Sequence, residues 1–180
     1  NLDVGDEAVV PISDVIDGTT TSIAALGAAR GADGRISLRE AITAANAIAE
    51  GTVKVAGAPV RAHCQVTGKM HQRVSTVDGN SYAIGFEMRL PTAWNGRFFY
   101  QANGGIDGSV GTATGAVNGG GGLDNALNKG FAVISSDAGH VGSLGPSFGI
   151  DPQARLDYGY QAVAKLTPMA KALIQTAYGK

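Results

Sequence analysis

The stretch Phe98-Phe-Tyr-Gln-Ala-Asn-Gly-Gly-Ile-Asp-Gly108 decides the fold of this 180-residue chain. It begins inside a short apolar run, residues 97–102, which lacks polar alternation and is therefore typical of a strand buried on both faces of a sheet. The run leads into a loop in which nine of the nineteen residues from 104 to 122 are glycine. A buried strand that ends in such a loop is the pattern of an α/β protein, whose ligands bind at the carboxyl ends of parallel strands.

The residues that follow the loop continue the α/β order. The pattern predicts a short helix over 123–128, closed by Gly130, and a second buried strand over 131–136. Two parallel strands joined through a helix form a βαβ unit with a right-handed crossover. Further helices are predicted from Asp151-Pro152 to about residue 164 and from Thr167-Pro168 to Tyr178, because proline favours the first helical position.

The residues that precede the stretch predict antiparallel strands. Strand-like runs cover 52–55, 64–67 and 82–90, and Asp78-Gly79 is a turn signal between the last two. Trp94-Asn-Gly96 then turns the chain into the stretch. The predicted fold class is therefore α/β, with antiparallel entry strands followed by the βαβ unit.

Residues 1–51 differ in composition from residues 52–180, which suggests an N-terminal extension followed by one main domain. The extension is rich in small and acidic residues, and the pattern favours one helix in it, Ser37 to Ala49. Ser37 is a suitable N-cap, and Glu40 occupies the capping-box position. The β-branched pair Ile42-Thr43 would equally continue a strand, so both readings stay open.

The composition excludes several classes of partner and cofactor. Fourteen basic and fifteen acidic residues give a net charge of −1, so neither nucleic acid nor an anionic membrane is an expected partner. No apolar run approaches the roughly 20 residues that span a bilayer. The single cysteine, Cys64, excludes an internal disulfide and a cysteine-rich metal site. His63 and His71 lie far in sequence from any carboxylate pair, so we expect no metal and no other cofactor.

The glycines after the strand have two possible roles. For residues 111–122 a flexible surface loop is a sufficient explanation. For residues 103–108 the position at a strand's carboxyl end favours main-chain N–H groups that face a ligand. The ligand would be a phosphate or the oxyanion of an acyl-transfer intermediate. The phosphate-binding patterns G-x-G-x-x-G and G-x-x-x-x-G-K are absent, which leaves the oxyanion.

Five ordered motifs resemble the tannase and feruloyl esterase family over residues 52–180. The motifs are Cys64-Gln-Val-Thr-Gly68, Phe86-Glu-Met-Arg-Leu-Pro91, Trp94-Asn-Gly-Arg-Phe-Phe-Tyr-Gln-Ala-Asn-Gly-Gly105, Gly130-Phe-Ala-Val-Ile-Ser-Ser-Asp-Ala-Gly-His140 and Phe148-Gly-Ile-Asp-Pro-Gln-Ala-Arg-Leu-Asp-Tyr-Gly159. The resemblance implies a partial α/β-hydrolase sheet and a secreted or periplasmic enzyme. It also implies a serine nucleophile, an aspartate and a histidine, with a disulfide between cysteines adjacent to the serine and the histidine. The implied substrates are small-molecule esters of aromatic acids, of the galloyl or feruloyl type.

By this resemblance the chain is expected to hold only part of a catalytic domain. The loop after the strand would supply an oxyanion-hole N–H from Gly104 or Gly105, in line with the general hydrolase rule for the second donor. The family's nucleophile motif, Gly-Cys-Ser-x-Gly-Gly, would follow a strand just beyond Lys180, and its aspartate and histidine come later. The expected partner is therefore the missing C-terminal half of the domain.

A second serine motif competes with this interpretation. Gly145-Pro-Ser147-Phe-Gly149 matches G-x-S-x-G, and His140 and Asp157 lie nearby in sequence, so a triad within this chain can be proposed. A nucleophile elbow needs a strand directly before the serine and a helix directly after it. Ten residues that include a proline separate the strand ending at Ser136 from Ser147, so the motif is disfavoured.

Three further residues are candidates for the substrate pocket. Asn103, Asp137 and His140 lie where predicted strands end at the edge of the sheet. An alternative is that Asp137 caps a turn and His140 orders the loop after it. Arg155, Asp157 and Tyr158 fall on a predicted helix, where a structural ion pair is favoured over catalysis.

The N-terminal extension carries a short resemblance of its own. Val15-Ile-Asp-Gly18 and Asp33-Gly-Arg-Ile-Ser-Leu-Arg-Glu-Ala-Ile-Thr-Ala-Ala-Asn46 resemble the motif that opens many secreted β-helix and adhesin-like proteins, with Ile36 where that motif carries cysteine. A variable extension is the favoured alternative.

Two hypotheses about function follow. The chain is the N-terminal portion of a secreted ester hydrolase, or it is a non-catalytic secreted binding or structural module. The first hypothesis also predicts an open sheet edge, because removal of later strands would expose the apolar flank of residues 131–134.

Overall fold

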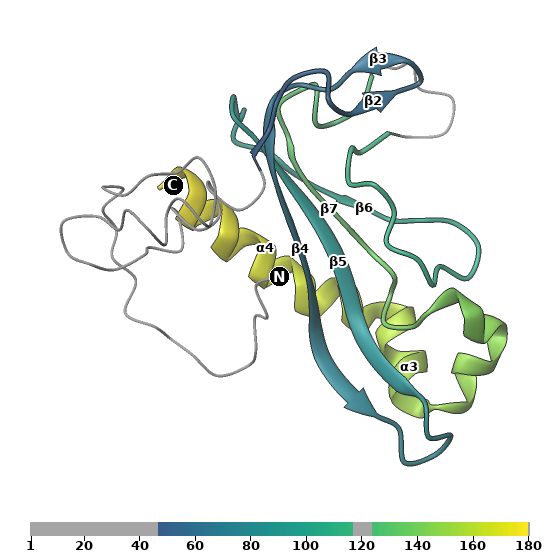
Figure 1. The fold of residues 1–180 in the computed structure, drawn as a ribbon. Coiled ribbons are helices and arrows are strands. Elements are labelled where there is room, and N and C mark those ends of the chain that lie inside the picture. The colour runs from purple at the N-terminus through teal and green to yellow at the C-terminus, as the bar shows by residue number, and fades with distance from the viewer. Residues whose placement is uncertain (1–46, 117–123, 180) are drawn as a thin grey trace, which may run out of the picture.

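The computed structural model describes residues 47–116 and 124–179, and these form a mixed β-sheet with helices packed on one face. The five-stranded sheet has the order β1-β4-β5-β7-β6. Its strands are β1 (Ala47–Ile48), β4 (His63–Val74), β5 (Ser81–Pro91), β6 (Phe98–Gln101) and β7 (Ala132–Ser136). Two short strands, β2 (Lys54–Val55) and β3 (Ala58–Pro59), form a separate hairpin at one end of the molecule (Figure 1).

Two of the three predicted entry strands lie in the main sheet: the runs over 64–67 and 82–90 are parts of β4 and β5, and β4 is much longer than predicted. The predicted strand over 52–55 is only partly present, as β2, which lies in the separate hairpin and not in this sheet. β4 and β5 pair from His63 with Pro91 to Val74 with Ser81, and the turn between them contains the predicted Asp78-Gly79 signal. The amide of Gly79 donates to the carbonyl of Ser75. This long hairpin forms the middle of the sheet: β1 pairs with β4 on one side of it, and β7 pairs antiparallel with β5 on the other.

The parallel pair is also present, but its crossover differs from the prediction. β6 and β7 are parallel, with Gln101 opposite Ser135. In the described parts of the connection, 102–116 and 124–131, no helix forms, so the expected βαβ unit is wrong there. Residues 126–130 form turns instead. Asn125 accepts a hydrogen bond from the amide of Asn128 at 2.8 Å, as an N-cap does, but Gly130 at φ +85° ends the segment after a single turn.

The open edge of the sheet lies on a different strand from the one predicted. The crossover inserts β7 between β5 and β6, so every residue of β7 is buried. The edge strand is β6, whose four residues are only half-buried, although the sequence predicted burial on both faces. The expected exposure of residues 131–134 is therefore wrong because β7 has a neighbour on each side.

The helices follow β7 as one nearly continuous segment. A 3₁₀ segment (Gly142–Ile150) leads to α3 (Pro152–Leu156), a π-helical turn (Asp157–Gln161) and α4 (Ala162–Tyr178). Asp151 caps α3 as predicted, since its carboxylate accepts a hydrogen bond from the amide of Ala154. The predicted new start at Pro168 is wrong: α4 continues through it, because the turns on both sides bury apolar side chains on the sheet.

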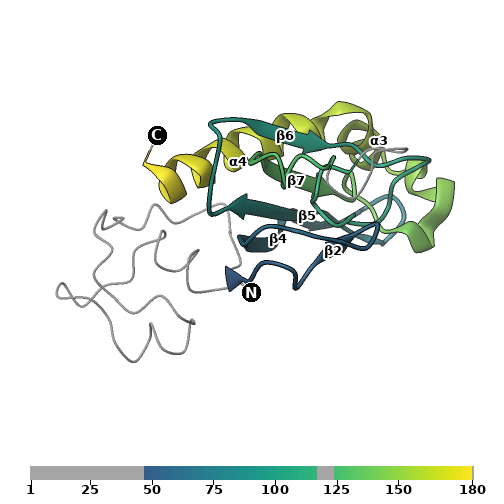
Figure 2. The same ribbon diagram turned by 90° about the horizontal axis from the view of Figure 1, so that it is seen from above.

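Helix α4 covers one face of the sheet and loops cover the other. Figure 1 shows α4 crossing behind the strands, and Figure 2 shows α4 and α3 on one side and β2 on the opposite side. The larger hydrophobic core lies between α4 and the sheet and includes Ile84, Phe86, Met88, Ile134, Leu166 and Ile174. A smaller core on the other face joins Val60, Ala113, Ala126, Leu127 and Val133.

Polar side chains on the loop face tie the crossover to the hairpin. Glu87 accepts hydrogen bonds from Gln65 at 2.6 Å and from Arg89 at 2.7 Å, and Arg89 in turn contacts the His63 ring at 3.0 Å. Glu87 also accepts a bond from the amide of Ala113 in the crossover. This network holds the glycine-rich connection against the sheet.

The predicted helix from Ser37 to Ala49 lies mostly outside the described residues. At its expected end, Ala47 and Ile48 form strand β1, paired with Cys64 and His63. The motif over residues 15–46 also lies outside the described part of the chain.

Candidate functional site

The site is built on the loop that leaves β6, residues 103–108, which we call the donor loop. It lies at the carboxyl ends of the parallel strands β6 and β7, since Gln101 pairs with Ser135 at the last position of their ladder. The donor loop is therefore at the edge where α/β sheets bind ligands.

The amides of Gly104 and Gly105 are exposed, and neither donates a hydrogen bond to any described residue. The carbonyls beside them are occupied. Gly104 O accepts a bond from the amide of Asp107 at 3.3 Å, and Gly105 O accepts one from the hydroxyl of Tyr158 at 3.3 Å. No described heavy atom lies within 4 Å of where a Cβ on either glycine would stand. Two N–H groups on exposed residues, with no hydrogen-bond acceptor among the described residues, can bind a carboxylate or an oxyanion.

Asn103 fastens the donor loop to the end of β7. Its side-chain amide donates to the carbonyl of Ser136 at 2.8 Å and to the hydroxyl of Ser135 at 3.2 Å. A longer bond, 3.4 Å, reaches the carbonyl of Ser109 on the far side of the loop. These contacts give Asn103 a structural role, and its predicted role in a substrate pocket stays a prediction.

Asp137 follows β7 and holds three segments together. Its carboxylate accepts hydrogen bonds from the amides of Gly85 and Gly139, each at 2.9 Å, and its carbonyl accepts one from the amide of Gly108 at the end of the donor loop. Burial raises the pKa of Asp137 to about 6. Its side chain also lines a cavity of about 360 Å³ with Lys69, Arg73, Tyr82 and Val141.

His140 lies beneath the donor loop and is almost completely buried, with 1% of its surface exposed. Its ring stacks on Phe148 with a centroid separation of 3.8 Å, and neither ring nitrogen has a hydrogen-bond partner among the described residues. Burial lowers the pKa of His140 and raises the pKa of neighbouring Asp107, whose charge favours the protonated ring. Whether His140 shapes a substrate pocket stays a prediction.

Ser147 is placed unlike a nucleophile on an elbow. It lies in the 3₁₀ segment, is exposed, and donates its hydroxyl hydrogen to the carbonyl of Leu144. The ring of His140 makes no hydrogen bond to it. Asp157 is instead paired with Lys165 at 2.8 Å and bonded to Gln153. The structure therefore does not join Ser147, His140 and Asp157 by the hydrogen bonds of a triad.

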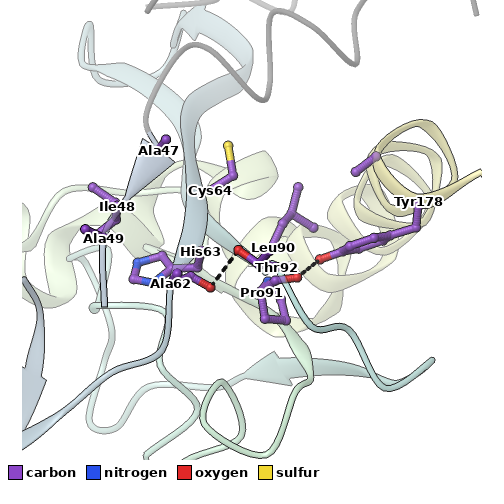
Figure 3. Close-up of a pocket in the computed structure, with 11 residues that line it drawn as sticks. Ala47, Ile48, Ala49, Ala62, His63, Cys64, Leu90, Pro91, Thr92 and Tyr178 are labelled. Carbon is purple, nitrogen blue, oxygen red and sulfur yellow. Dashed lines mark hydrogen bonds between the residues drawn. The ribbon is translucent and has the colours of Figure 1, made fainter. Parts of the chain in front are cut away.

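The larger cavity, of about 490 Å³, lies at the opposite end of the sheet (Figure 3). Its lining residues come from β1, the start of β4, the end of β5 and the end of α4, and include Ile48, Cys64, Leu90 and Tyr178. The hydroxyl of Tyr178 points to Pro91 and donates to its carbonyl at 2.7 Å. This cavity lies where β4 begins and β5 ends, and it shares no lining residue with the donor loop.

Two kinds of feature are absent from residues 47–116 and 124–179, the part of the chain that the structure describes. No group of three or more metal-ligating side chains occurs in them. None of their helices is both long and apolar enough to cross a bilayer.

Sequence reasoning placed Tyr158 on a helix and gave it no part in the site. The structure brings its hydroxyl to the donor loop and confirms that Asp157 forms a structural ion pair, with Lys165. The available signal was the tyrosine pair in Asp157-Tyr-Gly-Tyr160, because a glycine between two aromatic residues is unfavourable in a regular helix.

The sequence matches the family described as tannase and feruloyl esterase over residues 64–180. The chain is 40% identical over 126 residues to the mono(2-hydroxyethyl) terephthalate hydrolase of Piscinibacter sakaiensis, which covers 66% of this chain and 21% of that protein. It is 30% identical over 115 residues to feruloyl esterase B of Aspergillus niger, covering 64% of this chain and 19% of the relative. The chain thus spans about a fifth of the length of these curated relatives.

Two solved structures resemble the fold with a TM-score of 0.50. One is an esterase from Aspergillus oryzae, with 24% identity over 66% of this chain and 21% of that chain. The other is feruloyl esterase B from the same organism, with 23% identity over 74% of this chain and 25% of that chain. The resemblance supports an esterase-like arrangement of sheet and helices.

Proposed function

Because the chain belongs to the tannase and feruloyl esterase family, we propose that it is the N-terminal part of the catalytic domain of a secreted serine carboxylic ester hydrolase. Its substrates are esters of aromatic acids, of the galloyl or feruloyl type. Two relatives support this class by their names, one a hydrolase of a terephthalate ester and the other a feruloyl esterase.

One observation carries the proposal: the amides of Gly104 and Gly105 are exposed and unbonded at the carboxyl edge of the sheet. When a hydroxyl attacks an ester carbonyl, negative charge develops on the carbonyl oxygen. Fixed N–H groups at hydrogen-bond distance stabilise that charge, and removal of one such donor typically slows an enzyme by about 10²–10³. In this function the donor loop supplies one of the oxyanion donors.

The nucleophile and the general base are provided by residues beyond position 180. The open edge of β6 is the place where the remaining sheet continues, since its outer side has no partner among the described strands. A serine elbow on the next strand lies beside the donor loop in this arrangement. Asp137 and His140 belong to the floor of the site, and no metal or cofactor takes part.

The first test is whether the coding sequence continues beyond Lys180. We expect the coding sequence to continue past Lys180 into a strand and a Gly-Cys-Ser-x-Gly-Gly motif, and the complete product to hydrolyse methyl ferulate, methyl gallate or p-nitrophenyl acetate. Replacement of that serine by alanine should abolish the activity, whereas S147A should leave it unchanged. A stop codon directly after Lys180 would instead support a non-catalytic secreted module, and loss of activity in S147A would overturn the assignment of the nucleophile.

A further inference from the structure

Three aromatic rings lie directly beneath the donor loop. The ring of His140 stacks on Phe148 at 3.8 Å, and Tyr158 packs against both, at 5.8 Å from His140 and 5.2 Å from Phe148. We call Phe148, His140 and Tyr158 the ring cluster. His140 comes from the turn after β7, Phe148 from the 3₁₀ segment and Tyr158 from the π-helical turn, so the cluster joins three parts of the chain.

Tyr158 is the member of the ring cluster that makes a hydrogen bond to the donor loop. Its hydroxyl donates to Gly105 O at 3.3 Å, and the next carbonyl along, Gly104 O, accepts from the amide of Asp107. A trans peptide is planar, and its C=O and N–H point in opposite directions. The bond from Tyr158 therefore turns the N–H of Ile106 away from the Tyr158 hydroxyl, and the bond from Asp107 fixes the peptide that carries the N–H of Gly105.

Side-chain sterics do not fix the orientation of these peptides. Gly105 adopts φ +67°, in the left-handed region that glycine enters without penalty, and no described atom stands within 4 Å of its missing Cβ. An isolated Gly-Gly segment would sample many orientations. A hydrogen bond to the Gly105 carbonyl is thus an effective means of holding the segment after Gly105, and with it the loop that carries the donor amides, in one orientation before a substrate arrives.

The π-helical turn positions Tyr158 for this contact. In it the amide of Ala162 donates to Asp157 O, five residues back, which adds one residue relative to an α-helical turn. Asp157 anchors the turn through Lys165 and Gln153. The turn also lies close to the end of β7, because a Cβ on Gly139 would stand 2.7 Å from the Cβ of Asp157.

We propose that Tyr158 is a positioning residue of the oxyanion-donor loop: its hydroxyl fixes the Gly105 carbonyl, restricts rotation of the chain after Gly105 and so holds in place the loop that carries the amides of Gly104 and Gly105. This inference rests on the proposed esterase function. Tyr158 touches no reacting atom, and its effect passes through the peptide between Gly105 and Ile106.

The experiment compares Tyr158→Phe with Tyr160→Phe in the encoded protein that contains this chain. Each change removes one hydroxyl and keeps the ring, and Tyr160 is 58% exposed with its hydroxyl in contact with Gln161 alone among described residues. We expect Y158F to lower kcat for methyl ferulate about fivefold to tenfold, the effect of one hydrogen bond, with little change in KM. Y160F should match the wild type. Equal kcat values in Y158F and the wild type would overturn the inference.

A second readout does not depend on activity. With glycine and isoleucine selectively labelled with ¹⁵N, we expect the amide resonances of Gly105 and Ile106 to shift in Y158F and to stay in place in Y160F. Unshifted resonances in Y158F would show that the hydroxyl does not hold the loop. If the wild-type protein hydrolyses no ester, the esterase proposal fails, and this spectrum alone decides whether Tyr158 orients the peptide.

Discussion

Arg73 and Asp151 form a two-pronged ion pair that links the hairpin to the first helix. Nη1 of Arg73 lies 2.9 Å from Oδ2 of Asp151, and Nη2 lies 2.5 Å from Oδ1, across 78 positions of sequence. Asp151 is also the N-cap of α3. One carboxylate therefore fixes both the start of the helical segment and its contact with β4.

Asp151→Ala should destabilise the fold more than any surface carboxylate substitution. The change removes a helix cap and leaves Arg73 without its partner, which together should lower the free energy of unfolding by about 2–3 kcal/mol. Asp124→Ala is the control, because that side chain is 67% exposed and its pair with Lys129 should contribute less than about 1 kcal/mol. Urea denaturation measures both, and equal midpoints would show that the buried pair adds nothing.

Asp137 should make stability fall as the pH rises. Its pKa is about 6 in the folded protein against an ordinary value of 3.8, so the folded state holds the proton more tightly than the unfolded state. This tighter proton binding adds about 3 kcal/mol to the free energy of unfolding. The added stability is fully present below pH 3.8 and is lost as the pH rises through 6. Asp137→Asn keeps the acceptor oxygen for Gly85 and Gly139 but cannot ionise.

The measurement is a pair of urea titrations at pH 4.5 and pH 7.5. We expect D137N to gain stability relative to the wild type at the higher pH, and Asp124→Asn to change little between the two. A D137N difference that is the same at both pH values would rule out ionisation of Asp137 in this range.

Gly105→Ala should slow ester hydrolysis in the encoded enzyme, while it should destabilise the fold no more than a matched control substitution does. Alanine at φ +67° costs about 1 kcal/mol, and its methyl group would project into the open space in front of the donor amides. Gly57→Ala is the matched control, with φ +81°, equally open space and a position in the β2–β3 hairpin. We expect kcat to fall on the order of tenfold or more in G105A alone. Comparable activity in both variants would argue against a substrate at Gly105.

Asn103→Ala tests whether the position of the donor loop affects catalysis independently of the stability of the fold. Asn103 fastens the donor loop to Ser135 and Ser136, while Asn128 fastens residues 59–61 through Pro59 O and the amide of Arg61. Loss of either side-chain amide should lower the free energy of unfolding by about 1–2 kcal/mol, as measured by thermal or urea denaturation. Only N103A should lower kcat. If N128A lowers kcat as much as N103A does, the loss of activity reflects reduced stability, and the hydrogen bonds of Asn103 have no specific role in catalysis.

Local patterns in the sequence predicted the elements whose residues pair with near neighbours. Part of β4 and most of β5 were predicted together with the turn at Asp78-Gly79 that joins them, and β7 begins with the apolar run of residues 131–134. Asp151-Pro152 likewise combines a cap with a favourable first residue. The family motifs then indicated the donor loop, and the role of its amides as oxyanion donors stays a prediction.

The features that sequence reasoning missed depend on tertiary contacts. The segment after Asn125 forms only turns where a helix was predicted, and burial of Leu166 and Ala170 carried α4 through Pro168. Neither effect is visible in periodicity. The contact between Tyr158 and Gly105 spans 53 positions and depends on a π-helical turn, which leaves only a weak trace in composition.

The insertion of β7 between β5 and β6 has a consequence for biosynthesis. A ribosome completes Phe98–Gln101 before Ala132–Ser136 exists, so in the described sheet the earlier segment has no strand to pair with until the later one emerges. The hairpin of His63–Val74 with Ser81–Pro91 can assemble at once, because its contacts are local. Nascent chains should therefore expose an aromatic segment, Phe98-Phe-Tyr100, for the time needed to add about thirty further residues, a few seconds at ordinary synthesis rates. Chaperone binding during translation should concentrate on that interval.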